Sequence, residues 1–119
     1  MDVRELGRWG EERAARYLRM RGYSLVERNF TCRMGEIDII ARKRGFIVFV
    51  EVKLRKDAAF AQAREFVTRA KQQRVMAAAG LWLSQNETQL QPRFDVIEIY
   101  APRGEHGPVH IEHIEDAFQ

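Results

Sequence analysis

Three ionisable residues interrupt two apolar segments of this chain between positions 35 and 53. Asp38 lies in the first segment, and Glu51 and Lys53 lie in the second, where they alternate with valines. Because a strand loses burial free energy by keeping a charge, a purely structural hairpin has little reason to hold all three. Two carboxylates and a lysine can instead hold a hard cation and stabilise the charge that develops when a phosphodiester is hydrolysed. The pattern predicts a metal-dependent active site.

The two segments themselves predict an antiparallel hairpin. Residues 37–41 and 46–53 are rich in β-branched and aromatic side chains, and the loop 42–45 between them contains a glycine. Side chains alternate between the two faces of a strand, so Glu51 and Lys53 share a face. An ordinary ion pair on an exposed strand is the alternative interpretation of these two residues.

The register of the hairpin decides whether the acids meet. We expect Ala41 to face Phe46, which places Asp38 opposite Phe49 and diagonal to Glu51 on one face. Diagonal neighbours are roughly 7–8 Å apart, close enough to bracket one hydrated cation. A slip of one residue would move Asp38 to the other face, so the hypothesis requires a loop of even length or a compensating bulge.

Two further acids are candidates for the same site. Glu11 lies in a helix predicted from about residue 2 to 21, at the edge of its apolar face, so it can point inward as a metal ligand. A solvated charge is the alternative for a helical glutamate. Glu36 would face Glu51 in the expected register, either supporting the ligands from behind or lying outside the site.

The remaining elements predict an α/β domain. A strand over 23–30 follows the first helix, an alanine-rich helix over 68–84 follows the hairpin, and strands over 94–100 and 109–114 end the chain. Residues 55–65 show no firm pattern and are expected to form a mobile loop beside the site. The order α-β-β-β-α-β-β predicts a mixed central sheet, with residues 1–119 forming a single domain.

Basic residues are concentrated around the predicted site. Between residues 42 and 74 ten Lys and Arg stand against three acids, whereas from 75 to 119 two arginines stand against seven acids. Such a distribution favours a polyanionic partner, although a solvated basic surface explains it too. The residues expected to contact nucleic acid are Arg42, Lys43, Arg44, Arg55, Lys56, Lys71 and Arg74.

The composition indicates in which compartment and with which partners we expect the protein. Cys32 is the single cysteine, so the sequence predicts neither a disulfide framework nor a zinc site, and favours the cytoplasm. No apolar stretch approaches the roughly 20 residues of a membrane span, and the charged first residues are unlike a signal peptide, so no membrane partner is expected. Asp95, in an apolar strand, is expected to bond a backbone group or Arg93 rather than to act in catalysis.

The donor types indicate which cation fits. Two hard carboxylates that leave coordination positions to water and phosphate suit Mg²⁺ or Mn²⁺ better than zinc. Lys53 would orient the attacking water or neutralise the phosphate, and its role as acid, base or fixed charge stays open.

An Asp, a short hairpin and a Glu-x-Lys sequence resemble the PD-(D/E)xK nuclease superfamily, except that Ile37 stands where that motif has proline. More narrowly, and from end to end, the chain resembles the YraN family of small bacterial proteins, which are predicted endonucleases similar in fold to archaeal Holliday-junction resolvases. The matching motifs are Gly7-x-x-Gly10-Glu11, Tyr17-Leu18, Gly22-Tyr23, Arg28-Asn29, Gly35-Glu36-Ile37-Asp38, Phe49-Val50-Glu51-Val52-Lys53, Arg93-Phe94-Asp95 and His113-Ile114-x-x-Ala117-Phe118.

The resemblance implies a restriction-endonuclease-like αβββαβ core with a short extra C-terminal strand. It also implies that Glu11, Asp38, Glu51 and Lys53 form the catalytic set of an endonuclease acting on DNA, including branched or structured DNA. Two alternatives remain open: a catalytically silent nucleic-acid-binding or adaptor module with the nuclease fold, and an enzyme acting on another phosphate ester. The resemblance does not decide between a monomer and a homodimer.

Overall fold

A computed structural model of the chain describes residues 2–55 and 67–119. Helix α1 spans Val3–Met20, and its N-cap is Asp2, whose side chain accepts a hydrogen bond from the Glu5 amide at 2.8 Å. The helix is followed by Gly22, which adopts φ 90°, a conformation that glycine tolerates best. Small residues on its buried face let α1 lie against the sheet; the buried positions are Gly10, Ala14, Ala15 and Leu18.

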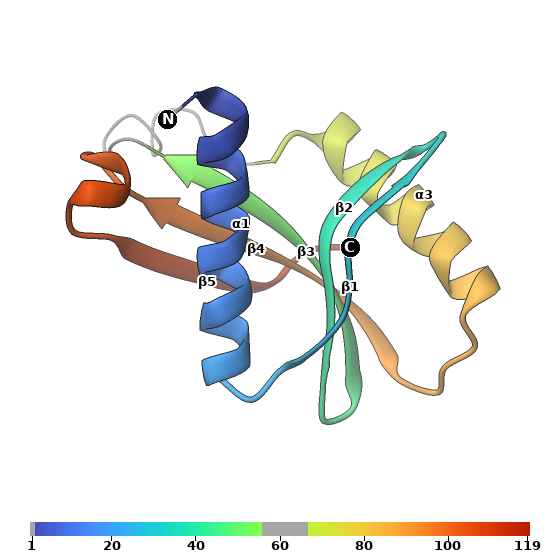
Figure 1. The fold of residues 1–119 in the computed structure, drawn as a ribbon. Coiled ribbons are helices and arrows are strands. Elements are labelled where there is room, and N and C mark those ends of the chain that lie inside the picture. Colours follow the sequence, from blue (N-terminus) through green and yellow to red (C-terminus); the bar gives the residue numbers. More distant parts are fainter. Residues whose placement is uncertain (1, 56–66) are drawn as a thin grey trace.

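Five strands form one mixed sheet in the order β1-β2-β3-β4-β5 (Figure 1). Their bounds are Ser24–Cys32 for β1, Gly35–Lys43 for β2, Phe46–Arg55 for β3, Gln91–Tyr100 for β4 and His110–Phe118 for β5. Neighbouring strands are antiparallel except β3 and β4, which are parallel and therefore need a crossover connection. That connection contains helix α3, Arg69–Gln85, and the architecture confirms the predicted αβββαβ core with an added C-terminal strand.

Each helix covers its own face of the sheet. On one face Leu18 of α1 packs in a cluster with Val48 and Ile97, and on the other Trp82 of α3 packs with Phe49 and Val96. Helix α3 begins at the N-cap Thr68, whose hydroxyl accepts the Lys71 amide at 3.2 Å. The helix predicted over 68–84 is confirmed, and its buried residues are Val75, Ala78, Ala79 and Trp82.

The β2–β3 hairpin has a different register from the predicted one. Lys43 pairs with Phe46, where the sequence predicts Ala41. The prediction is wrong by two residues because the connection is the two-residue turn Arg44-Gly45, not a loop of four, and Arg44 adopts the left-handed φ of 56°. An even shift leaves every side chain on its predicted face wherever the two strands pair, so the hypothesis of a shared face survives.

Strands β2 and β3 are not paired at Asp38. The ladder between them ends at the pair Ile39–Val50, and Figure 1 shows the β1–β2 hairpin bending away from β3 towards α3. Ile37 therefore packs in the α3-side cluster, not beside Ile39 as predicted. The ladder also ends before Glu36, so the prediction that Glu36 faces Glu51 is wrong as well.

The last strand is longer than predicted. Strand β5 is nine residues long and follows a single 3₁₀ turn, Gly104–His106. Strand β4 likewise begins before Pro92, which pairs with Ile47. Among residues 2–55 and 67–119 no helix has the length and apolar character needed to cross a membrane.

Candidate active site

Glu51 is the most enclosed acid of the predicted set. It lies on β3, on the face covered by α3, and only 5% of the residue is exposed. Two ammonium groups approach the same carboxylate oxygen: Lys53 Nζ lies 3.4 Å and Lys71 Nζ lies 3.6 Å from Oε2. The shared face predicted for Glu51 and Lys53 is therefore observed, and Lys71 of α3 joins them.

Asp38 lies where β2 separates from β3. Its Oδ2 accepts a hydrogen bond from the Val52 amide at 2.8 Å, so the side chain bridges the two diverging strands. Burial, followed by the negative charge of Glu51, raises the pKa of Asp38 to about 7, and the Val52 bond only partly opposes this. Within residues 2–55 and 67–119 no Lys, Arg or His forms an ion pair with Asp38. Among the residues that the structure describes, Asp38 is thus a half-buried acid without an ion-pair partner.

Two more acids lie within electrostatic range. Burial raises the pKa of Glu11 on α1, and the charges of Glu36 and Glu51 raise it further, while a hydrogen bond from Asn29 lowers it. Glu11 and Glu36 in turn contribute to the raised pKa of Asp38. The structure therefore places the acids that the sequence singles out, from α1, β2 and β3, within electrostatic range of one another.

The carboxylates suit a hard cation by their chemistry. They supply oxygen ligands only, and they repel one another, a repulsion that a divalent ion would relieve. In the described ranges, however, no three His, Cys, Asp or Glu side chains already stand in a metal-holding arrangement. A cation would therefore require side-chain rotation, and Asp38, Glu51 and Glu11 remain the predicted ligands.

Asn29 lies next to the acids, although the sequence alone did not indicate that it belongs to the site. It lies on β1 with a left-handed φ of 54°, and its side chain lowers the pKa of Glu11. Such a φ is uncommon outside glycine, and asparagine tolerates it better than most residues. The local signal was weak, because an Asn inside a predicted strand gives no indication of which helix it will meet.

The described basic residues that are predicted to contact nucleic acid lie in two regions, one at the β2–β3 turn and one nearer the acids. Arg42, Lys43 and Arg44 lie at the β2–β3 turn, four to six residues or about 13–20 Å along the chain from Asp38, so they do not surround the site. The Lys43 amine lies 5.0 Å from the ring centroid of Tyr23. Their contact with nucleic acid remains a prediction.

Arg55, Lys71 and Arg74 lie nearer. Arg55, at the end of β3, forms an ion pair with Glu98 at 3.2 Å and its side chain is 14% exposed. Lys71 contacts Glu51, and Arg74 is exposed on α3 one turn further along. Lys56, together with most of the predicted loop 55–65, lies outside the described residues.

A pocket of about 290 Å³ lies beside the acids, between α3 and the β1–β2 turn. Lys71 and Arg74 line one wall, and Glu36 lines the other. Gly35 also lines the pocket, and a Cβ atom added there would lie 3.1 Å from the Arg74 carbonyl oxygen. A larger residue at this position would push the turn away from the helix.

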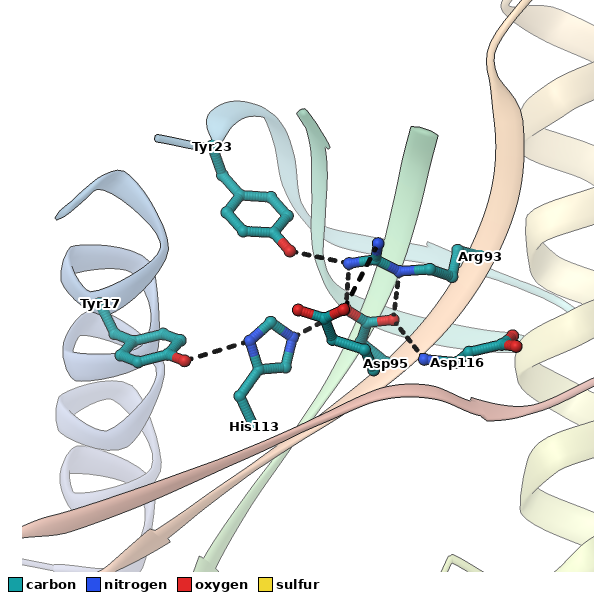
Figure 2. A network of polar contacts seen from close by, with 7 residues as sticks. Tyr17, Tyr23, Arg93, Asp95, His113 and Asp116 are labelled. Atoms are coloured by element: carbon teal, nitrogen blue, oxygen red, sulfur yellow. Dashed lines mark hydrogen bonds and ion pairs between the residues drawn. The ribbon is translucent and has the colours of Figure 1, made fainter. Parts of the chain in front are cut away.

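A second polar cluster lies on the α1 side of the sheet (Figure 2). Asp95 is fully buried and accepts hydrogen bonds from the Arg93 guanidinium at 2.7 and 2.9 Å and from the Asp116 amide at 3.0 Å. His113 Nε2 lies 2.7 Å from the same carboxylate, and its Nδ1 lies 3.2 Å from the Tyr17 hydroxyl. Because an ionised carboxylate only accepts, His113 donates through Nε2.

The cluster confirms the bonds expected of Asp95, to Arg93 and to a backbone group. Burial alone raises the pKa of Asp95, but the bonds from His113 and Arg93 outweigh it and hold the pKa below its usual value. Arg93 also donates to the Tyr23 hydroxyl at 2.7 Å. The sequence reasoning named Arg93 as a partner and missed His113 and both tyrosines, which lie up to 96 positions apart along the chain.

Comparison with known proteins places the chain among relatives without an assigned activity. The model of "Uncharacterised protein family UPF0102" matches residues 10–99. A UPF0102 protein of Geotalea daltonii is 48% identical over 118 residues, covering 98% of this chain and 91% of the relative. Those of Flavobacterium psychrophilum and Caldanaerobacter subterraneus are 41% and 42% identical, covering 96% and 99% of this chain and 93% and 98% of the relatives.

Proposed function

The chain belongs to the uncharacterised protein family UPF0102, and we propose that it is a metal-dependent endonuclease that hydrolyses phosphodiester bonds in DNA. One observation carries the proposal. Asp38 is a half-buried carboxyl whose pKa is raised to about 7 among other acids, and Lys53 lies beside the neighbouring Glu51. Perturbed carboxyls of this kind are costly to a fold and are concentrated at functional sites.

In this proposal the acids bind the metal ion and fix its position. Asp38, Glu51 and Glu11 would hold Mg²⁺ or Mn²⁺, because they offer hard oxygen ligands from three different elements. The ion supplies positive charge that offsets the charge developing on the phosphate oxygens during hydrolysis. Glu36 would tune these ligands through its own charge without contacting the reacting atoms.

Lys53 would act on the phosphate or on the attacking water. Its amine is held 3.4 Å from Glu51, so it stays within the site instead of extending into solvent. An ammonium group at this position can orient water and stabilise negative charge in the transition state.

DNA is the substrate that the charge distribution favours. Lys71 and Arg74 border the pocket beside the acids, and further basic residues extend along the β2–β3 turn. Cations placed in this way neutralise phosphates regardless of base sequence. Branched or otherwise structured DNA would contact both the basic residues at the pocket and those at the β2–β3 turn, which a short single strand would reach less completely.

The proposal is tested by cleavage of junction, duplex and single-stranded DNA with and without Mn²⁺. We expect cleavage only with the metal, and a loss of about 100-fold or more in Glu51→Gln and Lys53→Met, because each removes a charge that acts on the phosphate. Glu87→Gln is the matched control, since Glu87 is exposed and remote from the site.

Two outcomes would contradict the proposal. Cleavage that persists unchanged in Glu51→Gln would show that another protein in the sample produces it. Absence of cleavage on every substrate, with the wild-type protein folded and metal present, would favour the second candidate.

That second candidate is a nucleic-acid-binding or adaptor module that retains the fold without turnover. One observation favours it: Glu51 is already neutralised by Lys53 and Lys71, and the described acids do not stand in a metal-holding arrangement. It predicts DNA binding that weakens steeply with salt and does not depend on Mn²⁺.

A further inference from the structure

We propose that Lys71 is a second lysine of the site, which leaves Glu51 when a divalent cation binds and then holds a phosphate oxygen of the substrate. The inference rests on the proposed metal site and deepens it. It assigns to helix α3 a part in substrate binding that depends on the metal.

The first support is the double pairing at Glu51. Lys53 reaches Oε2 from two residues away on the same strand, so this carboxylate has a counter-ion without any help from α3. Lys71 nevertheless places its amine 3.6 Å from the same oxygen. At this distance the contact is an ion pair without a close hydrogen bond, so little is lost when it breaks.

The second support is competition for one carboxylate. A cation held by Glu51 and Asp38 would have to share the Glu51 carboxylate with the ammonium of Lys71, which now lies 3.6 Å from Oε2. Two positive charges at that distance repel each other, and the burial of Glu51 limits how far solvent screens the repulsion. Lys71 has a flexible four-carbon stem and can move, whereas its backbone is fixed in the first turn of α3 by the Thr68 cap.

The third support is the place to which Lys71 can move. The pocket of about 290 Å³ beside α3 is lined by Lys71 and Arg74, and it has room for a phosphodiester group. The Lys71 side chain is 25% exposed, so substrate can reach its amine.

The charge balance changes sign with the metal. Three cationic side chains at the site, Lys53, Lys71 and Arg74, face four carboxylates. If all are ionised, a divalent cation turns an excess of one negative charge into an excess of one positive charge. A phosphate would thus be attracted to the pocket only after the metal is bound.

The test measures metal affinity and DNA affinity separately in the full chain. Mn²⁺ alone is titrated into the wild type, Lys71→Met and Lys71→Arg by calorimetry. Binding of a short fluorescent DNA with phosphorothioate linkages, which resist hydrolysis, is then measured with and without Mn²⁺. Arg19→Met is the matched control, because Arg19 is exposed on α1 and its loss removes the same charge.

We expect opposite changes in Lys71→Met. Mn²⁺ affinity should rise by about three- to tenfold because the competing ammonium is gone, while the gain in DNA affinity on adding Mn²⁺ should fall by about tenfold. Lys71→Arg and Arg19→Met should resemble the wild type in both measurements. A purely structural role of Lys71 would lower both affinities together.

Unchanged or weaker Mn²⁺ binding in a folded Lys71→Met variant overturns the inference, and so does an undiminished gain in DNA affinity. If neither the wild type nor Lys71→Met binds Mn²⁺, the inference and the metal site fall together. Opposite changes in a protein that cleaves no DNA would sustain the inference while removing the proposed activity.

Discussion

At the scale of single residues, the proposed metal site depends most on Asp38. Its pKa is raised to about 7 by burial and by the charges of Glu51, Glu11 and Glu36. A folded-state pKa above the unfolded value of 3.8 means that the protonated carboxyl favours folding. Its contribution to stability is complete below about pH 3.8 and is lost as the pH rises through 7.

Asp38→Asn is therefore expected to stabilise the metal-free protein at pH 8 by about 2 kcal/mol, less than the full shift implies because solvent screens part of it. The amide oxygen can still accept the Val52 N–H, so the bridge between the strands is kept. At pH 4 the two proteins should differ little. Urea unfolding at both pH values measures the difference, and a gap that does not change with pH would contradict the assignment.

The residue types at the site were predictable from the sequence, and their pairing was not. Asp38, Glu51 and Lys53 stand out because charges in apolar strands are unexpected. The second lysine on Glu51 could not be foreseen, because Lys71 belongs to a helix whose position over the sheet is set by core packing. The ionic state of Asp38 likewise depends on burial that no local pattern reports.

At the scale of elements, the divergence of β2 from β3 creates the site. The alternation of apolar residues predicted both strands, but the turn chemistry was misjudged and the register was wrong by two. The shared face survived because an even shift preserves it. Gly35 is the one local feature that relates to the bend of the β1–β2 hairpin towards α3. The need for glycine there comes from its contact with Arg74 of α3, 39 positions later in the chain.

Gly35→Ala tests this contact. The added Cβ would lie 3.1 Å from the Arg74 carbonyl oxygen, so the turn and the helix must move apart, and we expect a loss of about 1 kcal/mol or more in stability. Gly80→Ala is the matched control: its added Cβ meets nothing within 4 Å, and alanine should stabilise the middle of α3 by about 0.5–1 kcal/mol. Equal effects of the two substitutions in thermal unfolding would argue against a close approach at Gly35.

At the scale of the whole molecule, the buried network around Asp95 joins α1, β4 and β5 behind the site (Figure 2). Figure 1 shows the two layers that it links, with α1 crossing one face of the sheet. The sequence predicted the sheet and its helices, since each has its own hydrophobic period. It did not predict this network, because its members become neighbours only once the fold is complete.

Asp95→Asn should destabilise the fold by about 3 kcal/mol, because it leaves the largely buried Arg93 charge with only the exposed Glu115, 3.9 Å away, as an acidic partner among the described residues. Tyr17→Phe removes one longer bond and should cost about 1 kcal/mol. Chemical unfolding at pH 7 measures both, with Glu112→Gln as the exposed control on β5. A cost for Asp95→Asn no larger than that of the control would mean that the network does not hold the layers together.

The central claim is that Asp38 and Glu51 hold a divalent cation, and titration of Mn²⁺ into the wild type and Asp38→Asn tests it most directly. We predict saturable binding by the wild type and by Glu87→Gln, and a loss of affinity of at least about tenfold in Asp38→Asn, which keeps the fold but removes one charged ligand. Equal affinity of the wild type and Asp38→Asn, or no binding by the wild type even with DNA present, would contradict the account.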